Sequence, residues 1–227
     1  MNKEIETLRK EITWLFKDKQ IEFIEPNYKK ELNEDFRNIF PNLYLLISKA
    51  HQTDLKINNE TFRLYTWKNK KRLSFGWLNK FDVFSFELTG LLDEHKLLLE
   101  CIGGIKESYN QPIQSLSNNK NFIFIESECK YGLNEWENYY NQTINDDNNI
   151  QINYENFLCF AKEANGNLTL YDKKTKEVYL FAPDHSFQNI VKINGQPDYT
   201  FYKIKGINNF TDYVETLAKE WLNETSN

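Results

Sequence analysis

Hydrophobic and polar positions in the second half of the chain follow the pattern of short β-strands. Apolar runs occupy 157–163, 168–172 and 177–182, and Asn165-Gly166 separates the first two runs. A type I′ hairpin turn needs positive φ at both central residues, which Asn and Gly tolerate best. The pattern therefore predicts a type I′ hairpin followed by a third antiparallel strand. The apolar run at 121–127 adds a fourth strand to the same sheet.

A period of about 3.6 residues predicts helices around these strands. Apolar side chains recur on one face at 3–17 and again at 210–222, and 91–102 is also expected to be helical. The last helix starts after Asn209, with Asp212 three residues on, which resembles a capping box. These helices and strands together predict an α+β fold, with a single antiparallel sheet and flanking helices.

The first 80 residues add a helix and a hairpin to this pattern. Residues 36–49 predict a helix that is interrupted or restarted at Pro41. The segments 61–67 and 73–77 both alternate, which predicts a hairpin, and four cations cluster in its turn between residues 68 and 72. With 40% hydrophobic and 15% aromatic residues, the chain can bury a sizeable core.

The order of several spaced residues resembles the SUKH superfamily, which includes fungal cell-wall-synthesis regulators and many bacterial immunity proteins. The residues that carry this resemblance are Gly103-Gly104, Phe160-Ala161, Asn165-Gly166, Asp172, Val178 and Asp184-His185. The resemblance covers 81–222 and implies a SUKH-like core domain at 81–227. Residues 1–80 would form an N-terminal helical segment and hairpin that pack on the same domain. The resemblance also implies a non-enzymatic immunity protein that neutralises a bacterial polymorphic toxin by direct binding.

Charge is unevenly distributed along the chain. The overall net charge is −5, and acidic residues concentrate between Glu126 and Glu155, interleaved with Tyr and Trp. Such a segment repels nucleic acid and attracts basic partners, and Tyr and Trp are frequent interface anchors. We therefore expect a basic toxin domain as the partner and no nucleic acid. No membrane partner is expected either, because no run of the chain is long and apolar enough to span a bilayer. The predicted partner-binding residues are Glu126, Glu128, Glu135, Trp136, Glu137, Tyr139, Tyr140, Asp146 and Asp147.

A plainer interpretation of the same segment stays open. The acidic residues could form a solvated surface, and helical spacing could place Trp136 and Tyr140 on an inward stripe. In that case some of the aromatic side chains would stabilise the fold and would not contact a partner.

Candidate chemistry in the sequence is sparse. Asp184-His185 could form half of an acid/base pair in a small hydrolase or transferase, and Glu126 and Glu128 would share one face of the predicted strand at 121–127. No nucleophile motif accompanies them, and the sequence has neither a paired His motif nor a Cys/His cluster. We therefore expect no catalytic, metal or cofactor site. A regulatory scaffold, as among the fungal relatives, is a further alternative.

The expected location is the cytoplasm. No run approaches the 18 apolar residues that suggest a membrane span, and the N-terminus carries both signs of charge without an apolar segment. The odd number of cysteines, Cys101, Cys129 and Cys159, predicts reduced and buried thiols.

Overall fold

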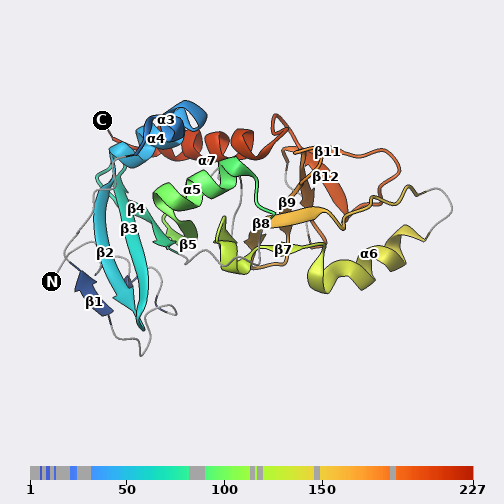
Figure 1. Cartoon of the computed structure of the whole chain (residues 1–227), viewed down its shortest axis with the longest axis horizontal. Helices are drawn as coiled ribbons and strands as arrows, with labels where there is room; N and C mark the ends of the chain where they lie inside the picture. Colours follow the sequence, from blue (N-terminus) through green and yellow to red (C-terminus); the bar gives the residue numbers. More distant parts are fainter. Residues whose placement is uncertain are drawn as a thin grey trace.

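The structure of the chain is a computed structural model with an α+β fold built on a large antiparallel sheet (Figure 1). This confirms the predicted α+β class with an antiparallel sheet, although the described residues place 12 strands in the sheet, many more than the sequence pattern indicates. The structure describes residues 21–24, 32–81, 90–112, 120–145, 149–184 and 188–226, together with the single positions 6, 9, 10, 13 and 116.

The described strands pair only in the antiparallel sense, in the order β1-β2-β3-β4-β5-β6-β8-β9-β10-β12-β11, with β7 attached to β8. Their bounds are β1 Ile21–Ile24, β2 His51–Ile57, β3 Glu60–Lys68, β4 Ser74–Lys80, β5 Gly104–Tyr109, β6 Lys120–Ile123, β7 Lys130–Tyr131, β8 Phe157–Glu163, β9 Leu168–Asp172, β10 Val178–Phe181, β11 Ile190–Lys192 and β12 Phe201–Ile204.

The described helices lie near the predicted positions, except for the helix at 137–144, whose second half was expected to be a loop. They are α3 (Glu34–Ile39), α4 (Pro41–Ser48), α5 (Asp93–Ile102), α6 (Glu137–Ile144) and α7 (Phe210–Glu224), with short 3₁₀ helices η1 (Glu126–Glu128) and η2 (Asn134–Trp136). The restart at Pro41 is confirmed. Asn209 caps α7 by accepting a hydrogen bond from the backbone N–H of Asp212. The predicted helix at 3–17 lies mostly outside the described residues, but positions 6, 9, 10 and 13 are helical.

The predicted hairpin at Asn165-Gly166 is confirmed, but the prediction of a type I′ turn is wrong. Gly166 has φ of +93° and Asn165 does not have positive φ. The Gly166 N–H donates to Glu163 O, so Ala164, Asn165 and Gly166 form a three-residue loop. Positive φ at both central residues occurs instead at Asn58-Asn59, in the two-residue loop between β2 and β3.

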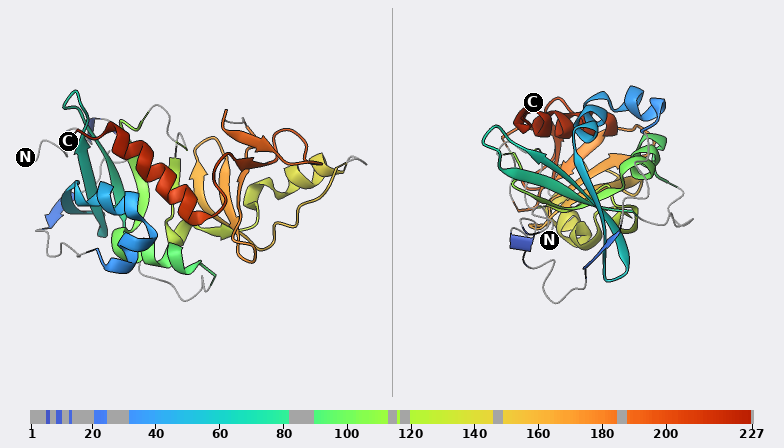
Figure 2. Two further views of the ribbon diagram at one scale, coloured as in Figure 1. Left: turned by 90° about the horizontal axis from the view of Figure 1, so that it is seen from above. Right: turned by 90° about the vertical axis from the view of Figure 1, so that its left-hand side faces the viewer.

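The sheet has two halves that share the larger of two hydrophobic clusters. Strands β1–β5 lie at one end of the elongated molecule with α3 and α4, while β8–β12 and α6 lie at the other (Figures 1 and 2). Hydrogen-bonded pairing continues between the halves through Ile105 and Ile123. Helix α7 crosses from one half toward the other, and buried residues of both halves form one continuous apolar cluster. The boundary predicted at residue 80 therefore falls between two paired strands, β4 and β5.

Other sequence expectations can be checked against the described residues. The three cysteines are buried thiols, as predicted. None of the described helices combines the length and apolar character needed to cross a bilayer.

Candidate partner-binding site

The predicted partner-binding residues lie in the segment that connects β6 to β8. The C-terminal part of strand β8 pairs with β6, where Ala161 lies opposite Ile123. The N-terminal part of β8 pairs with β7, where Cys159 lies opposite Lys130. Helix η1 bridges β6 and β7, and η2 leads from β7 into α6. The segment surrounds a hollow of about 280 Å³. Its lining includes Glu128, Lys130, Glu135, Cys159, Lys162 and Leu168.

The first two acidic residues do not lie on a strand as predicted. Strand β6 ends at Ile123, Phe124 takes a positive φ of 70°, and Glu126 and Glu128 lie in the 3₁₀ helix η1. They therefore do not share one strand face as paired carboxylates. Glu126 is 3% exposed and cannot contact a partner in this conformation, whereas Glu128 is half-buried at the hollow.

Lysines from other strands compensate the acidic residues around the hollow. Lys106 of β5 forms an ion pair with Glu128, and Lys162 of β8 forms an ion pair with Glu135. Partial burial, the largest single effect, raises the pKa of the Glu135 carboxylate, but the hydrogen bond from Lys162, a backbone hydrogen bond and the charges of Lys162 and Lys130 together outweigh it, so the pKa is lowered. The hollow is therefore less negative than the sequence of its own segment indicates.

The three predicted aromatic anchors differ in exposure. Tyr140 is fully buried, and its hydroxyl accepts the Ile152 N–H (2.9 Å) and lies 3.2 Å from Gln196 Oε1, to which it donates. Trp136 and Tyr139 are half-buried, with their rings 5.9 Å apart. Tyr140 thus belongs to the inward stripe that the alternative interpretation describes.

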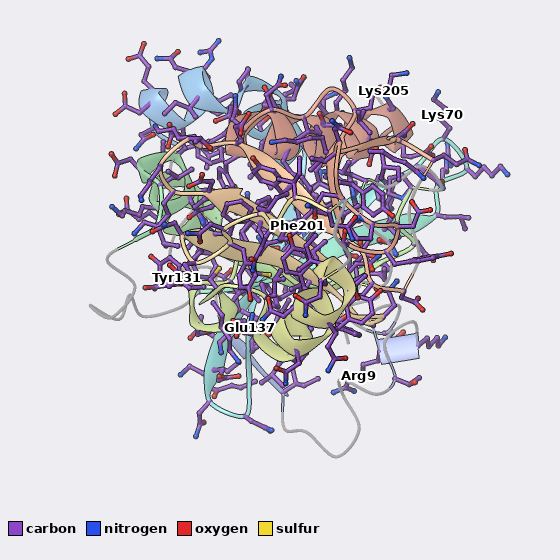
Figure 3. All side chains as sticks on the ribbon, turned by 90° about the vertical axis from the view of Figure 1, so that its right-hand side faces the viewer. Arg9, Lys70, Tyr131, Glu137, Phe201 and Lys205 are labelled. Atoms are coloured by element: carbon purple, nitrogen blue, oxygen red, sulfur yellow. The ribbon has the colours of Figure 1, made fainter. Side chains whose placement is uncertain are left out.

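The exposed part of the segment consists of a few residues. Glu135 and Glu137 are exposed, and Glu137 makes no ion pair with any residue in the described parts of the chain. Tyr131 on β7 is 40% exposed, with Lys173 Nζ 5.1 Å from its ring centroid. Figure 3 shows Tyr131 and Glu137 on the same side of the molecule, away from the core residue Phe201. Asp146 and Asp147 lie outside the described residues.

The candidate catalytic pair is only partly described. Asp184 is exposed, and His185 lies outside the described residues. Within the described ranges, no group of three or more His, Cys, Asp or Glu side chains is placed to hold a metal ion.

Sequence reasoning missed Glu107, a carboxyl group on β5 that is 7% exposed. Burial raises its pKa to about 8, the Lys106 cation opposes this shift, and the Glu128 carboxylate adds to it. Its position directly after Lys106 in a polar stretch gave no sign of burial, because burial here depends on neighbouring strands.

Together these features define an α+β protein with a small charged and aromatic surface, which is supported by buried aromatic side chains such as Tyr140. No family model matches the chain, and neither a curated protein nor a solved structure matches it.

Proposed function

We propose that this chain is a non-enzymatic binding protein of the cytoplasm, an immunity protein that neutralises a bacterial toxin domain by direct contact. The observation that carries the proposal is the exposure of Tyr131, Glu135 and Glu137 on a segment that is held in place by buried contacts. The SUKH-like order of residues supports the class of partner. The three buried cysteines, which form no disulfide among themselves, fit a reducing compartment.

The support beneath this surface favours recognition. Two hydrogen bonds of the Tyr140 hydroxyl join α6 to the loops at Ile152 and Gln196, and its ring packs on the core residue Phe201 at 5.1 Å. The Trp136 ring packs against Gly166 at the β8–β9 turn. A surface held in its binding conformation loses less conformational entropy when a partner docks. Rigid support also matches a protein that needs no moving catalytic parts.

The charges of the exposed segment determine how the association rate with a basic partner should depend on salt. A basic partner meets Glu137 without competition from an internal cation, but at Glu128 and Glu135 it must compete with Lys106 and Lys162. We therefore expect steering by a few charges only, with association that slows moderately as salt increases.

The first test identifies the partner by affinity capture from the native host, including products of adjacent genes, and then measures binding kinetics. We expect Glu135→Lys with Glu137→Lys to slow association, and Tyr131→Ala to weaken affinity by about 2 kcal/mol. Tyr140→Phe is the matched control, because it removes a buried hydroxyl. It should lower thermal stability and leave the association rate unchanged.

Two results would count against the proposal. If the association rate does not change with salt concentration or with the charge reversals, the interface lies elsewhere. Turnover of a substrate that His185→Ala abolishes, with the fold intact, would favour the hydrolase or transferase alternative.

A further inference from the structure

The turn between β3 and β4 carries a concentrated positive charge beside an exposed apolar side chain. The four cations are Lys68, Lys70, Lys71 and Arg72, and all are exposed. Leu73 follows them directly and is 59% exposed. The turn projects beyond its neighbours at the end of the molecule (Figure 2), and Lys70 lies at the rim of the outline in Figure 3.

Hydrogen bonds fix the conformation of this turn. The Asn69 Oδ1 atom accepts the backbone N–H groups of Lys71 and Leu73, both at 2.9 Å. The Arg72 N–H donates to Asn69 O at 2.8 Å, and Ser226 near the C-terminus donates its N–H to Lys68 O at 2.8 Å. The cations are therefore presented on an ordered backbone.

The cations of this turn differ from those of the other lysine-rich turn, because no described carboxylate pairs with them. None of its four cations forms an ion pair with a carboxylate in the described ranges. In the lysine-rich β9–β10 turn, by contrast, Lys176 pairs with Glu94 at 3.3 Å and Lys173 lies over the Tyr131 ring. Because the whole chain has a net charge of −5 and this turn contributes +4, the other residues together carry −9. A chain of net negative charge thus concentrates four cations, none of them paired with a described carboxylate, at one projecting turn.

We propose that the β3–β4 turn docks on an anionic lipid bilayer, with its cations at the phosphate headgroups and Leu73 in the interfacial layer. Leu73 favours a bilayer over a polynucleotide, because nucleic-acid backbones offer cations a partner but give little apolar surface for an isolated Leu. The lack of a spanning segment led to the expectation of no membrane partner, but a peripheral contact of this kind needs none.

The expected strength is modest and measurable. Each Lys or Arg near an anionic leaflet strengthens binding about fivefold, so four cations contribute on the order of several hundredfold. Burial of Leu73 adds roughly tenfold. The acidic body opposes binding, but its charges are screened beyond a Debye length of about 8 Å, which favours an orientation with the turn forward.

The experiment is co-sedimentation of the full chain with two kinds of vesicles. One is pure phosphatidylcholine, and in the other phosphatidylserine replaces about a third of it. We expect binding to the anionic vesicles only, and a loss of at least about tenfold in Lys70→Glu with Lys71→Glu. Lys174→Glu with Lys205→Glu is the matched control, because it reverses the same charge at two other exposed turns. We expect the control to bind within about threefold of the unchanged protein.

A second variant tests the apolar part, and Leu73→Ser should weaken vesicle binding about tenfold. Unchanged melting temperatures would show that the variants fold. Equal losses in the two charge-reversal variants would overturn the proposal in favour of a net-charge effect. Absence of binding to anionic vesicles would overturn it too. If the protein binds duplex DNA more tightly than anionic vesicles, and Leu73→Ser leaves the DNA binding unchanged, the turn binds a polynucleotide and the proposal is wrong.

Discussion

At the scale of single residues, His95 organises the junction between the two halves of the sheet. It lies on α5 with its side chain fully buried, and its ring stacks on Phe210 at 4.7 Å. Because the carbonyl of Phe124 can only accept, Nε2 carries the proton and donates to it at 2.8 Å. The Tyr171 hydroxyl accepts the Leu92 N–H and donates to Nδ1, each at 3.3 Å. Every partner therefore suits the neutral imidazole.

This network predicts a pH dependence of stability. Burial lowers the pKa of His95 to about 4, while the Phe124 carbonyl opposes this shift, and the unfolded value is near 6.5. Between pH 6.5 and 4, His95 is therefore protonated in the unfolded chain but stays neutral in the folded chain. Stability is therefore fully present above about pH 6.5 and falls by about 3 kcal/mol as the pH drops to 4.

The measurement is denaturant unfolding of the unchanged protein and His95→Gln across this pH range. The difference between their two curves isolates His95, since Glu107 contributes equally to both. Glu107 acts in the opposite direction, because a pKa raised to about 8 favours folding most at low pH. A difference that stays constant from pH 4 to 6.5 would show that the pKa of His95 is the same in the folded and unfolded chains.

At the scale of elements, the β8–β9 hairpin depends on the fit between its turn and η2. A Cβ atom on Gly166 would lie 2.5 Å from Cζ2 of Trp136, and the φ of +93° is itself unfavourable for other residues. Gly206, in the turn between β12 and α7, has φ of +79° but no atom within 4 Å of the same position. The two glycines therefore separate backbone strain from steric overlap.

We expect Gly206→Ala to cost about 1 kcal/mol of unfolding free energy, from backbone strain alone. Gly166→Ala should cost about 2 to 4 kcal/mol, because overlap with the indole adds to the strain. Thermal or denaturant unfolding of both variants measures the two costs. Equal losses would mean that Trp136 moves aside freely, and η2 would then be only loosely attached to the hairpin.

Strands are predictable from the sequence where local signals are strong. Strands β8 and β9 match their predicted bounds because dense apolar runs flank a turn that contains Gly. Strand β2 was missed because Leu55 and Ile57 are its only buried positions, and β5 because polar residues alternate along it. Both strands are stabilised by pairing with neighbours, which a local pattern does not contain.

The candidate site shows the same limit. The acidic residues and the inward position of Tyr140 could be inferred from spacing along one segment. The cations Lys106 and Lys162 could not, because β5 and β8 bring them to Glu128 and Glu135 from elsewhere in the chain. Charge patterning along a segment therefore overestimates the negative potential of the surface that it forms.

At the scale of the whole molecule, α7 links the two halves of the sheet. Near its C-terminal end, the Trp221 ring lies 5.4 Å from Phe75 and 4.9 Å from Trp77, which occupy alternate positions on one face of β4. At its start, Phe210 lies 5.2 Å from Phe160 and 5.8 Å from Tyr171. One rigid helix thus packs on β4 in one half and on β8 and β9 in the other, so we expect the halves to unfold together.

Trp221→Ala tests this coupling, because Trp221 is fully buried. We expect a loss of about 3 to 5 kcal/mol, typical of removing a large buried aromatic. Lys219→Ala, on the exposed side of the same helix, should change stability by less than about 0.5 kcal/mol. Native-state hydrogen exchange then reports the amides of β3 and β9 separately, and protection should fall by the same amount in both strands. A loss below about 1 kcal/mol would mean that α7 is not docked. A large loss confined to β3 would instead show that the halves unfold independently, since a helix that couples them must transmit the lost packing of Trp221 to the strands around Phe210.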